Sequence, residues 1–141
     1  MNAEFYFNRA VEKTRQKNLM GAIEDYSTAI ELSSGQMTKT ISVKKSETET
    51  IHTNIIETSV GFENMYYNRA CCYFDLGNFE KAESDYTKFI EYNQNDAEVY
   101  FKRAVTYYCL EKDDLVEEDL AKAFNLDPKF NRELFSQQFQ R

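Results

Sequence analysis

The chain repeats nearly the same hexapeptide three times, and this repetition limits the folds open to it. It reads FYFNRA at residues 5–10, MYYNRA at 65–70 and VYFKRA at 99–104. The second and third copies begin 34 residues apart, whereas the first and second begin 60 apart, so one boundary carries about 26 extra residues. A fixed period of this length indicates a stack of similar structural units.

A second pattern follows each hexapeptide in the same phase. It reads GAIEDYSTAIEL at 21–32, KAESDYTKFIEY at 81–92 and VEEDLAKAFNL at 116–126. The small residues Ala10, Ala70 and Ala104 recur at one aligned position. A single Pro and four Gly among 141 residues favour helices joined by tight turns over a turn-rich β protein.

These features resemble the tetratricopeptide repeat, a unit of two antiparallel helices, A and B. The resemblance implies an all-α fold, an α–α superhelix of three helical hairpins in one domain, residues 1–141. It places repeat 1 at about 3–34, repeat 2 at 63–96, repeat 3 at 97–130 and a capping helix at 129–140. The first repeat departs at Lys13, where the family prefers a bulky apolar residue.

Helix boundaries can be predicted within this frame. Gly77 is expected to end a helix A and Asn78 to cap the next helix B. Asn95 is expected to start the third helix A, and Pro128 to stop the third helix B. The capping helix would cover the last repeat with four apolar residues, Phe130, Leu134, Phe135 and Phe139.

The insertion, residues 35–62, is rich in Thr, Ser, Ile and Val. Ile41 and Val43 alternate with polar residues, as does the stretch around Ile51, and this favours a β-hairpin or a loop with strand tendency. A lone hairpin is marginal in water, so its apolar face would rest on the repeats, a partner or a second copy of the chain. A disordered, tolerated insertion is the alternative.

Composition narrows the function. A formal charge of −7 and a pI near 4.8 disfavour nucleic acid and anionic membranes as partners. The sequence has no long apolar run and no signal-peptide pattern, and its three Cys suggest reduced thiols, so we expect a cytoplasmic protein. Its motifs predict no catalytic constellation, cofactor or metal site, which argues against an enzyme.

A recurring Arg and a recurring Asp accompany the repeats. Arg9, Arg69 and Arg103 close the hexapeptides, while Asp25, Asp85 and Asp119 recur in the B helices. We expect structural ion pairs between an Arg of one repeat and the Asp of its neighbour. The alternative is a row of Arg side chains that grips a ligand carboxylate.

The resemblance also implies a concave groove lined by the A helices. An aromatic residue recurs at one groove position, as Phe7, Tyr67 and Phe101, beside Asn8, Asn68 and Lys102. Such a ladder suits a partner site, although the rings could instead pack on one another. The full set of groove candidates is Phe7, Asn8, Val11, Tyr67, Asn68, Cys71, Phe74, Phe101, Lys102, Val105 and Tyr108.

One subgroup of the family holds a chaperone's C-terminal carboxylate in a clamp of Lys, Asn and Arg. Asn68 matches that clamp and Lys102 could replace its Arg. The other three positions hold Phe7, Val11 and Glu98, which are unsuited to a carboxylate, so the full clamp is not expected.

The sequence therefore predicts a non-catalytic interaction module that holds a peptide or a helix in the groove. A structural protein that forms a homodimer through residues 37–60 is the second hypothesis.

Overall fold

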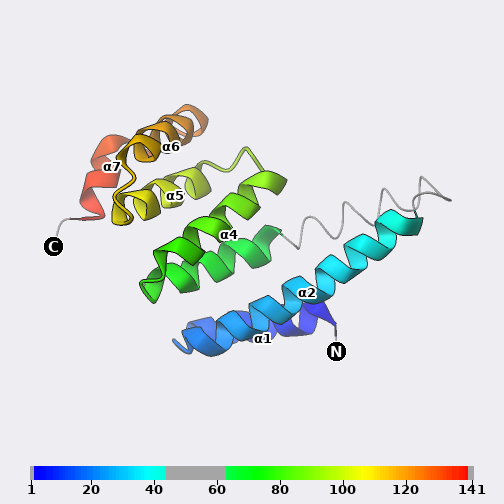
Figure 1. Ribbon diagram of the computed structural model, residues 1–141. Coiled ribbons are helices and arrows are strands. Elements are labelled where there is room, and N and C mark those ends of the chain that lie inside the picture. The colour runs from blue at the N-terminus through cyan, green and yellow to red at the C-terminus, as the bar shows by residue number, and fades with distance from the viewer. Residues whose placement is uncertain (1, 44–62, 140–141) are drawn as a thin grey trace. The chain divides into compact units, whose positions relative to one another are not determined.

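The computed structural model describes residues 2–43 and 63–139, and every regular element in these ranges is a helix (Figure 1). The chain divides into two compact units, Met1–Cys72 and Tyr73–Arg141. The boundary falls inside a helix over residues 63–75. The all-α fold predicted from the repeats is confirmed.

The first unit pairs α1, Ala3–Arg15, with α2, Leu19–Val43, and adds the start of the helix over 63–75 (Figure 1). Its interior contains Ala10, Ala22 and Tyr26 packed with Cys72. Ala10 and Ala22 are fully buried, which lets the two helix backbones approach closely. The small residues seen in the sequence therefore set the helix crossing of this unit.

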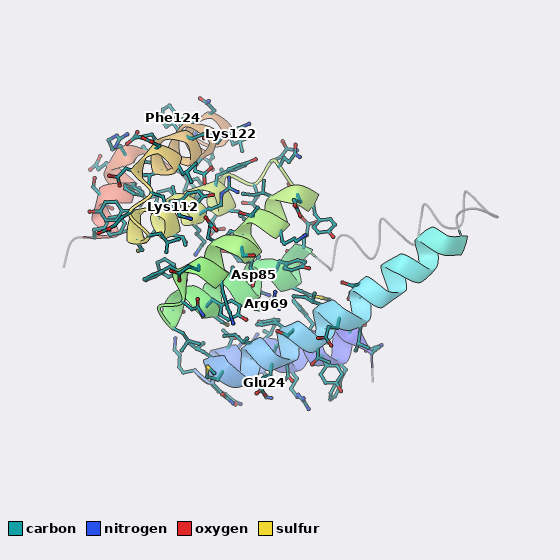
Figure 2. The ribbon with its side chains drawn as sticks, in the orientation of Figure 1. Glu24, Arg69, Asp85, Lys112, Lys122 and Phe124 are labelled. Carbon is teal, nitrogen blue, oxygen red and sulfur yellow. The ribbon has the colours of Figure 1, made fainter. Side chains whose placement is uncertain are left out.

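The second unit contains α4, Phe79–Tyr92, α5, Ala97–Cys109, α6, Asp113–Leu126, and α7, Arg132–Gln137. Helix α5 contacts both α4 and α6. Its core joins Tyr100, Phe101 and Val105 of α5 to Leu120 of α6 and Phe135 of α7. Phe124 of α6, labelled in Figure 2, stays about half exposed.

The helix ends follow local chemistry. Asn2, Asn78 and Asn131 each accept a hydrogen bond from a backbone N–H in the first turn of α1, α4 and α7. Gly77 has φ of 81°, the left-handed conformation that ends a helix, so both predictions at 77 and 78 are confirmed. The third helix A starts one residue later than predicted, because Asp96 and not Asn95 is the cap that accepts from Glu98 N–H.

The hairpin predicted in the insertion is wrong for its first strand. Helix α2 continues through residues 35–43, so Ile41 and Val43 are helical. The alternation that suggested a strand spans only about five residues, too few to separate a strand from a helix that is already under way. The rest of the predicted insertion, residues 44–62, lies outside the described residues.

Candidate functional site

Arg9 and Arg103 each form a two-pronged ion pair with an Asp of the same repeat. Arg9 Nε and Nη2 both lie 2.8 Å from the carboxylate oxygens of Asp25. Arg103 Nε and Nη2 lie 2.7 and 2.9 Å from those of Asp119. The prediction that these pairs join neighbouring repeats is therefore wrong for Asp25 and Asp119, since each pair joins helix A to helix B of one hairpin.

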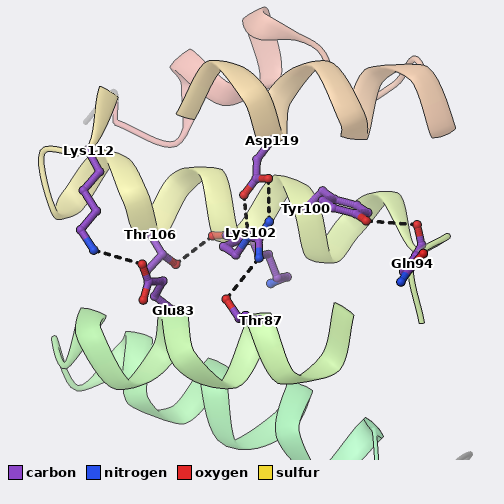
Figure 3. A network of polar contacts seen from close by, with 9 residues as sticks. Glu83, Thr87, Gln94, Tyr100, Lys102, Thr106, Lys112 and Asp119 are labelled. Atoms are coloured by element: carbon purple, nitrogen blue, oxygen red, sulfur yellow. Dashed lines mark hydrogen bonds and ion pairs between the residues drawn. The ribbon is translucent and has the colours of Figure 1, made fainter. Parts of the chain in front are cut away.

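The contact between repeats uses a different nitrogen of the guanidinium. Arg103 Nη1 donates to Thr87 Oγ1 of the preceding helix B at 3.1 Å (Figure 3). Arg69 Nη1 donates in the same way to Ser27 Oγ at 2.9 Å. Ser27 and Thr87 occupy aligned positions, so the same hydrogen bond recurs within each compact unit.

The Arg9–Asp25 ion pair strongly lowers the pKa of the Asp25 carboxyl group. The hydrogen bond from Arg9 lowers the pKa of Asp25 from 3.8 to about 2, against the opposing effect of burial. Lys13 Nζ adds a contact of 2.9 Å to Asp25 Oδ2, which explains a charged residue at a position where an apolar one was expected. Because the Arg and Asp side chains satisfy one another, the alternative of an Arg row reserved for a ligand carboxylate is unsupported at Arg9 and Arg103.

A cavity of about 240 Å³ opens on the helix A face of the second unit. Phe101, Lys102 and Val105 of α5 line it, with Phe74 from the end of the helix over 63–75. These four residues were groove candidates in the sequence, and the fold brings them to one cavity. The remaining lining residues are Tyr86, Glu98, Phe130 and Gln138.

The C-terminal segment forms part of this cavity. The Phe101 ring lies 5.2 Å from that of Phe130 and 6.2 Å from that of Phe135, measured between centroids. Phe101 is only 6% exposed, so it is a wall of the cavity and not a freely exposed ring. Tyr108 lies outside the cavity lining; its ring packs edge-on against Phe135 at 5.8 Å and at a tilt against Phe139 at 4.1 Å, between centroids.

The other six candidates belong to the first unit and do not line this cavity. Phe7 packs edge-on against Tyr26 at 5.8 Å, and Val11 packs on the same cluster. Asn8 is exposed, whereas the candidates on the helix over 63–75 are half-buried: Tyr67, Asn68 and Cys71. The first and last rings of the proposed ladder therefore have different neighbours, since Phe7 packs on Tyr26 of helix B and Phe101 packs on Phe130 and Phe135 near the C-terminus.

Three residues of the cavity that matter chemically were not among the groove candidates predicted from the sequence. Glu98 was considered as the partner of Asn95 at a helix start and as a departure from the carboxylate clamp, but not as a groove residue, although it lies one helical turn before Lys102. Phe130 was predicted to cover the last repeat, and Gln138 lies within the same predicted capping helix, so neither was expected to line a binding site. Their part in the cavity depends on how that segment folds back, which the repeat pattern does not encode.

Other chemistry is sparse in the part of the chain that the structure describes. No group of three His, Cys, Asp or Glu residues there could hold a metal ion. Cys71, Cys72 and Cys109 form no disulfide bond, and burial raises the pKa of Cys109. Within residues 2–43 and 63–139, no helix combines the length and apolar character needed to cross a membrane.

Comparisons with known proteins agree with this architecture. The family model described as "Tetratricopeptide repeat" matches residues 64–96. The first TPR of Spaghetti (RPAP3), solved bound to the HSP90 peptide SRMEEVD, is 20% identical, with a TM-score of 0.69 over 97% of this chain and 92% of that one. The Arabidopsis OM64 TPR domain is also 20% identical, with a TM-score of 0.67 over 96% and 92%. No curated protein matched the sequence.

Proposed function

Because the chain carries a tetratricopeptide repeat and has the fold of tetratricopeptide-repeat domains, we propose that it is a non-catalytic module that binds a peptide or helix on its helix A face. The observation that carries the proposal is the cavity between Phe74, Phe101 and Val105. It lies on the face where the sequence placed partner contacts. A domain of the same fold holds a peptide in the RPAP3 structure.

The cavity suits one bulky side chain of a partner. Its volume of about 240 Å³ is below the roughly 300–1,000 Å³ of pockets that take whole small ligands. Phe74, Phe101, Val105 and Phe130 supply apolar walls, and Glu98, Lys102 and Gln138 supply polar groups. A protein segment that inserts an apolar anchor and pairs its backbone or flanks with the polar groups fits this arrangement.

The test is a selection of random twelve-residue peptides displayed on phage against the full chain, followed by fluorescence polarisation with the enriched peptides. Gln138→Trp should weaken binding about tenfold or more, because an indole at this exposed lining position fills the cavity mouth. Gln137→Trp is the matched control, since Gln137 is an exposed neighbour that does not line the cavity.

Equal binding by wild type and Gln138→Trp would mean that peptides bind elsewhere on the protein. A selection that enriches no peptide sequence would count against the proposed function itself. Circular dichroism of both Trp variants checks that the helices remain intact.

A further inference from the structure

A second cavity adjoins the first and shares two of its residues. It has a volume of about 440 Å³ and lies where the loop before α5 meets the loop after α6. Glu98 and Phe130 line both cavities. The two cavities therefore meet at Glu98 and Phe130.

The second cavity is polar and carries negative charge. Its lining has three carboxylates, those of Asp96, Glu98 and Asp127, against one ammonium, that of Lys129, which gives a formal charge of −2. Lys129 Nζ lies 3.8 Å from Asp127 Oδ2, so its charge is already directed to that carboxylate. Asn93 and Asn95 add side-chain amides, whose carbonyl oxygens accept hydrogen bonds.

Glu98 is the residue best placed to meet a ligand. Asp96 Oδ1 accepts from Glu98 N–H, and Asp127 Oδ1 accepts from Lys129 N–H, so both of these carboxylates have local roles in the backbone. The Glu98 side chain is exposed, and its carboxylate makes no hydrogen bond or ion pair with the side chains described in residues 2–34 and 63–139. It stands at the junction of an apolar and an acidic cavity.

We infer that the occupant of this site is a protein segment in which a bulky apolar side chain lies within about two residues of an Arg or Lys. This rests on the proposed function and specifies its partner. The apolar side chain enters between Phe101 and Phe130, and the cation reaches Glu98 and the second cavity. An acidic segment would instead meet net negative charge there, which disfavours it.

The experiment uses the same phage-displayed twelve-residue library and the full chain. Enriched peptides should pair Leu, Ile, Met or Phe with a nearby Arg or Lys, and their binding should weaken as salt increases. Glu98→Lys should weaken binding of such a peptide about tenfold or more. Glu118→Lys is the control, because Glu118 is an exposed carboxylate of α6 that lines neither cavity.

A charge swap gives a second readout. A peptide whose Arg or Lys is replaced by Glu should bind wild type poorly and regain affinity for Glu98→Lys. If the enriched peptides are acidic or uncharged, or if Glu98→Lys binds as tightly as Glu118→Lys, the inference is wrong while the proposed function stands. If no peptide is enriched, and light scattering instead finds a dimer that Gln138→Trp abolishes, a second copy of the chain occupies the site and the inference is also wrong.

Discussion

The two Arg–Asp pairs have the same geometry but differ in their exposure to water. The Arg9 side chain is 45% exposed, whereas that of Arg103 is 15% exposed. Asp25 and Asp119 are almost equally buried, at 6% and 4%. The difference therefore lies in how well each Arg could be hydrated if its carboxylate partner were removed.

Removing the carboxylate should cost more at the second pair. We expect Asp119→Ala to lower the free energy of unfolding by about 3 kcal/mol, because it leaves the largely buried Arg103 charge without its main partner. Asp25→Ala should cost less, because Arg9 can be hydrated. Urea denaturation followed by circular dichroism measures both, and an equal or reversed order would contradict the role assigned to exposure.

The lowered pKa of Asp25 predicts a pH dependence. A carboxyl group whose pKa falls from 3.8 to about 2 on folding stabilises the folded state above pH 4, and this contribution is lost as the pH falls towards 2. Asp25→Asn should therefore be less stable than wild type at pH 7, and the gap should narrow between pH 4 and pH 2. Thermal melts across this range test it, and a gap that is constant with pH would rule out the linkage.

The sequence could align these residues but not choose their partners. A 34-residue period fixes which side chains are equivalent, and Arg9, Arg103, Asp25 and Asp119 were correctly aligned. Which Asp each Arg reaches depends on the crossing of helices A and B, because a side chain can turn towards its own hairpin or the next one. The hydroxyls of Ser27 and Thr87 were not singled out, since Ser and Thr are common on solvated helix faces.

Among the elements, the turns between helices A and B show how unequal the three repeats are. Gly77 has its counterparts in Lys17 and Glu111, and all three residues adopt positive φ, at 81°, 64° and 59°. Side chains other than Gly are disfavoured in this conformation. The first and third turns therefore carry backbone strain that the second avoids.

Substitutions at these turns should act in opposite directions. Gly77→Ala should destabilise by about 1 kcal/mol through the backbone alone, because a Cβ there meets no atom within 4 Å. Lys17→Gly and Glu111→Gly should each stabilise, by up to about 1 kcal/mol. Chemical denaturation of the three variants provides the measurement, and destabilisation by both Gly substitutions would show that side-chain contacts outweigh the relief of strain.

The C-terminal helix was predicted as a cover, and its packing agrees with that role. Phe135 is 6% exposed and contacts Phe101, Tyr108 and Phe139. Phe135→Ala should destabilise the second unit by about 3 kcal/mol, because it removes a buried ring and leaves a cavity. Hydrogen exchange of α5 amides should quicken in this variant, while Phe139→Ala, at a more exposed ring, should have a smaller effect.

At the scale of the whole molecule, the groove along three repeats stays a prediction, and the cavity of the proposed site lies within one unit. All eight residues that line the cavity lie between Phe74 and Gln138. A variant that lacks residues 45–60 should therefore bind the selected peptides as tightly as wild type. Fluorescence polarisation tests this, and light scattering of the same two proteins tests the alternative of a homodimer that depends on the insertion.

The repeat pattern thus predicted the helical hairpins and their order along the chain, while the face on which a partner binds stays a prediction. It could not predict the site's chemistry, because Glu98, Phe130 and Gln138 come together only when the loop ends and the C-terminal segment fold against α5. Phe130 and Gln138 belong to the segment at and after the end of the last repeat, and the 34-residue period carries no information about how that segment packs.

In two repeats, the Arg of helix A donates a hydrogen bond to a hydroxyl of the preceding helix B, so this contact always joins a repeat to the one before it. Ser27 and Thr87 accept it from Arg69 and Arg103, but the next aligned pair is Ala121 and Gln137, which can form no such bond. Helix α7 is tied to α6 by the Arg132–Glu117 ion pair instead. A further hairpin added after α6 could therefore repeat this hydrogen bond only if a Ser or Thr replaced Ala121 and an Arg replaced Gln137.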